Sequence, residues 1–240
     1  MSELKRIFET KAENYVLRDW GGEMCFLATD ETAGAEKIFV TAVLRMRPAL
    51  DHDAHFHDDG DEMLVVLDGE GSQSFWDDPE DPKKESRYPV RPGDVMYIIK
   101  NRIHRTDNAS NTKPLYLFIM NYNIEGQSAF THRGIVFSEE TKEQETDFGT
   151  VRQIFNKTVC GNDLTEGEFL TVLPGKEYSA APAEKEDVIF NISGSCSITS
   201  EETGACDFNT RTLGFFHAGE SYTLKNTGET PARFWHVRVR

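Results

Sequence analysis

Four potential metal ligands, three histidines and one carboxylate, constrain this chain more than any other feature. His55 and His57 lie two residues apart, and side chains at this spacing on a strand point to the same face. Both rings can therefore reach one ion. Residues 58–61 are rich in turn formers, and the apolar run 63–67 predicts a new strand with Glu62 at its start. The chain thus brings three donors together from two segments.

The fourth donor is His104, in the segment 91–108. This segment predicts a Pro-Gly turn, a buried strand, a second polar turn and another strand. Such a meander would bring the chain back beside the segments that carry the first three donors. We therefore expect His55, His57, Glu62 and His104 to form one metal site.

The spacing of these residues resembles the two sequence motifs of the cupin superfamily. In its first motif a Gly is followed by His-x-His, a Glu and a second Gly, and the run from His55 to Gly69 fits this pattern. In its second motif a Gly is followed by a His and an Asn, which Gly93, His104 and Asn108 match in spacing. The resemblance implies a small β-barrel that carries one metal ion on these ligands.

Three positions depart from the two motifs. Ala49 stands where the first motif has its leading Gly, and Ile99 and Asn101 replace the Pro and Gly of the second. All three are turn positions. They put the shape of the loops in doubt rather than the ligands.

The second half of the chain repeats the strand pattern of the first. Residues 168–173 parallel 38–44, and residues 187–194 parallel 62–69. Short strands rich in β-branched and aromatic residues also follow each other through the first half. We expect an all-β protein with two cupin-type barrels of the double-stranded β-helix or jelly-roll kind in tandem. The predicted domains are an N-terminal barrel with the metal site at 1–130, a linker at 131–150 and a degenerate C-terminal barrel at 151–240.

The second barrel is predicted to lack a metal site. In the repeat register Ala181 and Ala183 take the two histidine positions, Asp187 takes that of Glu62, and Tyr222 takes that of His104. Three of the four ligands are replaced. His217 and His236 lie elsewhere in this half, and we expect structural roles for both.

The charge of the chain narrows its partners. The 240 residues hold 41 acidic and 26 basic side chains, a formal net charge of -15. Nucleic acid and anionic membrane surfaces require a basic patch, so we expect neither as a partner. The chain shows no signal peptide and no apolar run of about 20 residues, which predicts a cytoplasmic protein. Paired barrels with edge strands also favour a homodimer.

The ligand set does not name the metal. Imidazole suits iron, nickel, zinc and copper, and a carboxylate extends the range to manganese, so we expect one divalent transition metal ion per chain from this group. Four protein ligands leave open positions for a small-molecule substrate. The first function hypothesis is a dioxygenase acting on a small organic acid or an enolisable or aromatic compound. Glu62 would then be both ligand and catalytic acid or base.

Apolar side chains support the dioxygenase hypothesis. Leu64 and Val66 share the parity of Glu62, and a further apolar set is expected to point inward with them. That set is Phe75, Trp76, Phe118, Met120 and Tyr122. His52, by contrast, has the opposite parity to His55 and is expected to point outward.

Two alternatives stay open. One is a non-oxidative lyase, decarboxylase, isomerase or hydrolase, whose small anionic substrate would be attracted by Lys100, Arg102 and Arg105 around the His104 turn. The other is a cupin-type binding protein without catalysis, because fold alone does not imply function. Turnover without oxygen would distinguish the two enzyme hypotheses.

Overall fold

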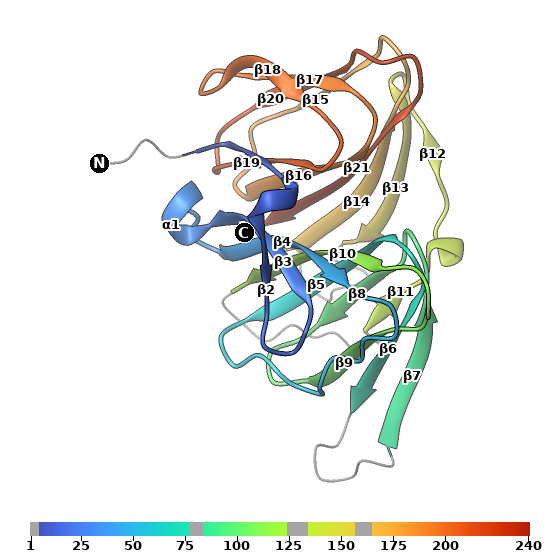
Figure 1. Ribbon diagram of the computed structural model, residues 1–240. Helices are drawn as coiled ribbons and strands as arrows, with labels where there is room; N and C mark the ends of the chain where they lie inside the picture. The colour runs from blue at the N-terminus through green and yellow to red at the C-terminus, as the bar shows by residue number, and fades with distance from the viewer. Residues whose placement is uncertain (1–4, 77–83, 124–133, 157–164) are drawn as a thin grey trace.

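The computed structural model describes residues 5–76, 84–123, 134–156 and 165–240. Strands make up most of this part of the chain and form two barrels, one stacked on the other (Figure 1). The first barrel runs from blue to green in the lower half of the view, and the second from yellow to red in the upper half. The predicted all-β class with two barrels in tandem is confirmed.

The first barrel consists of a seven-stranded and a three-stranded sheet. The larger sheet has the order β11-β8-β5-β10-β4-β3-β2 and the smaller one β7-β6-β9. The bounds of these strands are β2 (Tyr15–Leu17), β3 (Glu23–Thr29), β4 (Ile38–Met46), β5 (Asp61–Asp68), β6 (Gly71–Trp76), β7 (Glu85–Val90), β8 (Val95–Ile98), β9 (Ile103–Asn108), β10 (Leu115–Tyr122) and β11 (Ile135–Val136).

The second barrel repeats this arrangement. Its seven-stranded sheet has the order β1-β19-β16-β21-β14-β13-β12, and its four-stranded sheet has the order β15-β20-β17-β18. The bounds are β1 (Ile7–Glu9), β12 (Gln144–Glu145), β13 (Gly149–Phe155), β14 (Thr165–Val172), β15 (Glu177–Ala180), β16 (Glu186–Ser193), β17 (Cys196–Ser200), β18 (Gly204–Phe208), β19 (Thr212–Phe216), β20 (Tyr222–Asn226) and β21 (Ala232–Val239).

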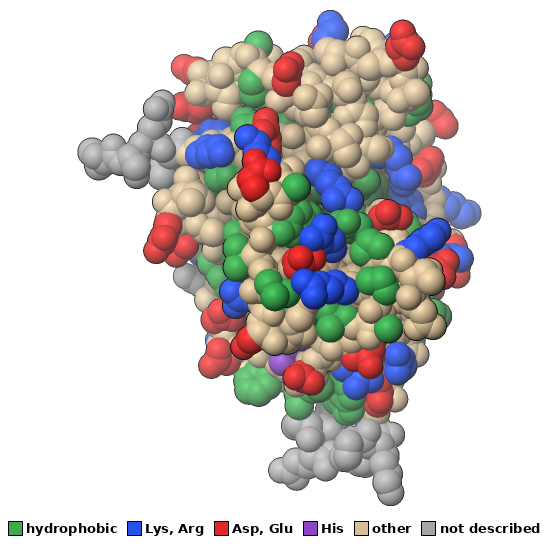
Figure 2. All heavy atoms as spheres, viewed as in Figure 1, with side chains coloured by type: hydrophobic (Ala, Val, Ile, Leu, Met, Phe, Trp, Pro, Cys, Tyr) green, Lys and Arg blue, Asp and Glu red, His purple; other side chains and the backbone are tan. Residues whose placement is uncertain are grey.

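Helices are few and short in the described residues. They are the 3-10 turns η1 (Ala12–Asn14) and η3 (Ser138–Glu140) and the single turn α1 (Asp30–Ala33). None of these helices has the length and apolar composition that a membrane crossing requires. Acidic and basic side chains are interspersed on the face shown in Figure 2.

The two large sheets pack against each other through one shared apolar core. Phe118 of β10 contacts Phe190 of β16, with ring centroids 4.9 Å apart. Val65, Trp235 and Val237 belong to the same cluster. Each barrel also has its own core on the other face of its large sheet. Alternate residues of every central strand therefore serve two different cores, as the period of two requires.

Strand pairing crosses the predicted domain boundaries. β1 pairs with β19, so residues near the N-terminus complete the large sheet of the second barrel. Within the predicted linker, β11 pairs with β8 of the first barrel and β12 pairs with β13 of the second. The boundaries at 130 and 150 stay predictions.

The turns keep the conformation of the two motifs where the residues depart from them. Ala49 and Asn101 both have positive φ, 55° and 66°, at positions where the motifs have glycine. Asn tolerates this region better than other non-glycine residues, whereas Ala pays a steric cost of roughly 1 kcal/mol. The repeat has glycine at both places, Gly175 and Gly219, also with positive φ. The backbone therefore has positive φ at these two places in both barrels despite the substitutions.

Candidate metal centre

The four predicted ligands come from three segments of the first barrel. Glu62 is the second residue of β5 and faces the barrel interior, as Leu64 does two residues later. His104 lies on β9 and is almost fully buried. His55 and His57 lie on the irregular chain between β4 and β5. The His55 segment is held to β9 by two backbone hydrogen bonds, His55 N to His104 O at 3.0 Å and His104 N to His55 O at 2.9 Å.

The structure brings these four side chains together. The ligand nitrogens of His55, His57 and His104 all lie within 4.8 Å of one another. The Glu62 carboxylate faces two of the rings, with 3.1 Å from Oε2 to His104 Nε2 and 3.5 Å from Oε1 to His57 Nε2. The side chain of Glu62 is only 7% exposed. Three imidazoles and one carboxylate thus converge on one small volume.

Backbone carbonyls orient two of the histidine rings. Nδ1 of His55 lies 2.9 Å from the Asp53 carbonyl oxygen, and Nδ1 of His104 lies 3.0 Å from the Arg102 carbonyl oxygen. A carbonyl accepts only from a protonated nitrogen, so both contacts place the ring proton on Nδ1. In a neutral ring with its proton on Nδ1, Nε2 is the nitrogen that can bind a metal ion.

The donor set fits a divalent ion. Nε2 of His57 and Nε2 of His104 are buried and face the Glu62 carboxylate at 3.5 and 3.1 Å, but neither contact has the geometry of a hydrogen bond. Buried polar atoms normally have a partner, and two orphaned ring nitrogens beside a carboxylate suit a metal. Burial raises the pKa of Glu62, but His104 and His57 outweigh it and hold that pKa far below its usual range. The carboxylate is therefore ionised, as a ligand must be.

His52 does not point outward, and the prediction for it was wrong. Its ring lies against that of His55, with centroids 4.3 Å apart. The reason is a one-residue irregularity in strand pairing. Asp51 pairs with Asp107 and His55 with His104, so four steps on one strand face three on the other. Such a bulge reverses side-chain parity. Burial lowers the pKa of His52 to about 4.

The apolar lining of the site is smaller than predicted. Leu64, Val66 and Phe75 belong to the core of the first barrel, as expected. Phe118, Met120 and Tyr122 instead belong to the core between the barrels, so the prediction that they point inward was wrong. Leu117 and Ile119 are the residues of β10 that face the first barrel's interior. Alternation along β10 separates its side chains into two faces, but both faces are apolar. The sequence alone therefore could not show which face points into the first barrel.

The three predicted cations are partly engaged elsewhere. Arg105 forms ion pairs with Asp107 at 3.1 Å and Glu85 at 3.5 Å. The guanidinium of Arg102 lies over the ring of Phe75 at 4.3 Å. Lys100 is exposed, and its backbone nitrogen donates to Asp61. Arg105 is therefore a poor candidate for substrate attraction, because its charge is already compensated.

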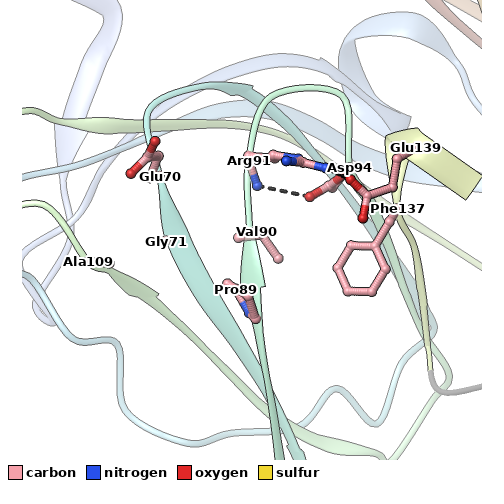
Figure 3. A pocket seen from close by; sticks show the side chains of 9 residues that line it. All are labelled: Glu70, Gly71, Pro89, Val90, Arg91, Asp94, Ala109, Phe137 and Glu139. Atoms are coloured by element: carbon pink, nitrogen blue, oxygen red, sulfur yellow. Dashed lines mark hydrogen bonds and ion pairs between the residues drawn. The ribbon is translucent and has the colours of Figure 1, made fainter.

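A separate hollow of about 530 Å³ opens at the end of the β7-β6-β9 sheet that lies away from His104 (Figure 3). Its wall includes Gly71 and Ala109, together with Val90 and Phe137. Gly71 pairs with Asn108, whereas His104 pairs with Phe75 at the far end of β6. The hollow contains none of the four predicted ligands and is not part of the metal centre.

The second barrel has a different group at the equivalent place. Ala180, not Ala181, lies opposite Tyr222, one residue from the position that the sequence repeat gave. Either residue lacks a donor atom. The Tyr222 hydroxyl donates to Asp187 at 3.0 Å, so the two remaining counterparts of the ligands do meet. His236 and Arg238 on β21 also contact Asp187.

These side chains form a closed polar network in the second barrel. Nε2 of His236 lies 3.0 and 3.1 Å from the two oxygens of Asp187, and its Nδ1 lies 2.9 Å from Glu168. Nε of Arg238 donates to Asp187 at 2.9 Å. A cavity of about 200 Å³ lies beside this network. Sequence analysis missed the roles of His236 and Arg238, although their spacing of two on the last strand places both on one face.

Comparison with known proteins agrees with this architecture. Residues 42–121 match the cupin domain family. No curated protein matches the chain closely enough to count as a relative. Three similar solved structures are oxalate decarboxylases. The formate complex of the Lactobacillus farciminis enzyme has a TM-score of 0.78 at 11% identity, covering 98% of this chain and 86% of that chain.

Two of them come from Bacillus subtilis. A structure from a study of the Mn(II) centers of the enzyme has a TM-score of 0.78 at 12% identity, and it covers 100% of this chain and 78% of that chain. The structure at pH 4.6 has a TM-score of 0.76 at 13% identity, with 100% and 77% covered. At these identities the likeness shows the fold. The family match covers part of the first barrel, and the structural likeness covers the two-barrel fold of the whole chain.

Proposed function

We propose that this protein is a metal-dependent lyase that removes a carboxyl group from a small carboxylic acid at the centre in the first barrel. The observation that carries the proposal is the cluster of His55, His57 and His104, with the Glu62 carboxylate against two of the three rings. The structural likeness to oxalate decarboxylases supports the non-oxidative alternative over the dioxygenase.

The chemistry divides between the ion and the chain. A divalent ion supplies a Lewis acid that binds and polarises a carboxylate. His55, His57 and His104 would hold it through Nε2, and Glu62 would be the fourth ligand. Manganese is the first metal to test, because a study of the similar Bacillus subtilis enzyme names Mn(II) centers.

Glu62 would also handle the proton. Loss of carbon dioxide from a carboxylic acid leaves a carbon that must gain a hydrogen, so a proton donor is required beside the reacting carbon. Glu62 is the only carboxylate in the ligand set, and its Oε1 lies 3.5 Å from His57 Nε2. We propose that Glu62 leaves the ligand position when it takes up a proton and then returns that proton to this carbon, because a carboxyl group binds a metal only while it is ionised.

The smaller apolar lining also favours a small acid. Phe118, Met120 and Tyr122 were expected to line a cavity for an aromatic substrate, but they face the other barrel. The core on the side of Glu62 contains Leu64 and Ile119 and keeps only Phe75 of the predicted inward-pointing aromatic residues. A large aromatic compound finds fewer stacking partners there. The cytoplasmic location and the homodimer stay predictions.

The test is turnover with and without oxygen. Protein loaded with Mn²⁺ would be given oxalate and a panel of small dicarboxylic and oxo acids under strict anaerobiosis. We expect carbon dioxide release without oxygen, and none from His57→Ala prepared in the same way. Oxygen uptake that accompanies turnover would instead support the dioxygenase. No turnover with any acid, together with intact metal binding, would support the binding protein.

A further inference from the structure

Three aromatic rings stand in a row that ends at one of the metal ligands. The ring centroids of Trp20 and His52 are 3.9 Å apart, and those of His52 and His55 are 4.3 Å apart. Trp20 also packs against the core of the first barrel. Neither Trp20 nor His52 belongs to the ligand set, so the row of Trp20, His52 and His55 links the ligand to the barrel through side chains alone.

His55 needs such a support more than His104 does. His104 lies on β9, a regular strand paired along its length with β6. His55 lies outside any strand and is held by one isolated bridge. Its Nδ1 contact goes to Asp53, a residue of the same irregular segment, and so does not fix the ring to a sheet. The His55 ring contacts the rings of His52 and His104, each with centroids 4.3 Å apart. Because His104 is itself a predicted ligand, His52 is the ring outside the ligand set that limits the rotation of His55.

The bulge that places His52 here is absent from the second barrel. There, the pairing from Glu177 with Lys225 to Ala180 with Tyr222 has three steps on each strand. The extra residue in the first barrel turns His52 to the side of His55. Bulges next to active sites commonly re-aim a side chain in this way.

Trp20 is itself held by a glycine. A Cβ added at Gly22 would lie 1.9 Å from Cη2 of Trp20, so the indole lies directly against the Gly22 backbone. The turn is closed by the hydrogen bond from Arg18 N to Gly22 O at 2.8 Å. Any other residue at position 22 would push the indole away from its place. The indole is thus fixed on one side by the turn and meets His52 on the other.

We infer that Trp20 and His52 are positioning residues, which hold the His55 ring in the orientation that binds the metal. This inference rests on the proposed metal centre. Residues that orient metal ligands typically change metal affinity by 10-fold to 100-fold when they are replaced. The stack acts through ring contact, so another flat ring at position 52 should serve.

The experiment measures binding of Co²⁺ to metal-free full-length protein, with the dissociation constant and the visible absorption of the bound ion as readouts. We expect His52→Ala to weaken binding by about tenfold, with a changed absorption band. His52→Phe should bind nearly as tightly as the wild type. Gly22→Ala should behave as His52→Ala does, although it touches no ligand.

Two matched controls separate this effect from general damage. His217 is a histidine of the second barrel whose ring contacts Phe215 at 5.3 Å, and His217→Ala should leave Co²⁺ binding unchanged. At Gly228 an added Cβ meets its nearest atom only at 3.4 Å, so Gly228→Ala should also have no effect.

The outcomes distinguish the two proposals. Wild-type affinity and absorption in both His52→Ala and Gly22→Ala would overturn the positioning role while leaving the metal centre intact. Equal losses in His52→Phe and His52→Ala would also overturn it, because a flat ring would then not suffice. If His52→Ala does not fold, wild-type Co²⁺ affinity in Gly22→Ala overturns the positioning role, and so does weakened binding in His52→Phe. A wild-type protein that binds no Co²⁺ would remove the metal centre and the inference with it.

Discussion

The two barrels share a frame but balance a buried carboxylate in different ways. Glu62 in the first barrel and Asp187 in the second occupy equivalent places on β5 and β16, and both are almost fully buried. Glu62 faces the imidazoles of His57 and His104, whereas Asp187 faces His236 and Arg238. A buried carboxylate requires a compensating cation. We conclude that the second barrel supplies this cation from its own side chains, and we propose that the first takes it from solution as a metal.

The pKa values of the histidines and buried carboxylates can be compared between the two barrels. Burial lowers the pKa of His236, but Asp187 and Glu168 outweigh it and raise that pKa to about 9. Burial raises the pKa of Asp187, and His236 and Arg238 bring it below its usual value. At neutral pH the second barrel therefore contains a protonated imidazole at its centre. In the first barrel burial and His104 lower the pKa of His55, whereas the contact with Glu62 raises the pKa of His57.

The largest effect is expected from removing the carboxylate of the second barrel. Asp187→Ala leaves protonated His236 and Arg238 buried without their partner. Breaking one side of a buried ion pair typically costs about 3 to 5 kcal/mol. Urea unfolding would measure the loss, with Asp207→Ala on the exposed face of β18 as control. An unchanged unfolding free energy would mean that the network is not what balances this site.

The pH dependence of stability should come next in size. The pKa of His236 is raised from 6.5 to about 9 in the fold, so its contribution is fully present below pH 6.5 and is lost as the pH rises through 9. The loss is on the order of 3 kcal/mol. Metal-free protein and His236→Gln would be unfolded in urea between pH 6.5 and 9.5. Parallel curves for the two proteins would contradict a protonated His236.

Replacing a predicted ligand in the first barrel should lower stability only through the loss of the bound metal ion. His104→Ala should abolish metal binding and lower stability by the linkage amount, which is about 2.7 kcal/mol at a metal concentration a hundred times the dissociation constant. Thermal unfolding with Mn²⁺ and with a chelator would separate this amount from lost packing. If the wild type gains no stability from metal, the first barrel does not depend on an ion.

The smallest effect should follow from replacing the counterpart of His104. Tyr222→Phe removes the hydroxyl that donates to Asp187, while His236 and Arg238 still compensate that carboxylate. One such hydrogen bond contributes about 1 kcal/mol. Metal content should be unchanged. A folded Tyr222→Phe protein without metal would mean that the two barrels share one site.

Sequence patterns could predict the frame of this protein because motif spacing and strand period are local properties. The repeat register placed Asp187 and Tyr222 together, and they share a hydrogen bond. Gly69 and Gly93 have the positive φ that their turns require. Motif spacing predicted four donors that the fold brings close to one another, although His55 and His57 lie on irregular chain rather than on a strand.

Two features lay beyond such patterns. The bulge before His55 reverses the parity of His52, and nothing in the residues 51–55 marks the extra step. The face of Phe118 was misassigned because β10 is apolar on both sides, one toward each core. The network around Asp187 was within reach. His236 and Arg238 share a face of the last strand. Asp187 takes the position of Glu62 without histidines around it, and a buried carboxylate requires a compensating cation.

The most direct test of the account is a metal count on three proteins purified without chelators. We expect about one transition-metal ion per chain in the wild type, none in Glu62→Ala, and the wild-type amount in Asp187→Ala. Two ions per chain in the wild type would contradict the asymmetry between the barrels. So would metal that persists in Glu62→Ala but is lost from folded Asp187→Ala.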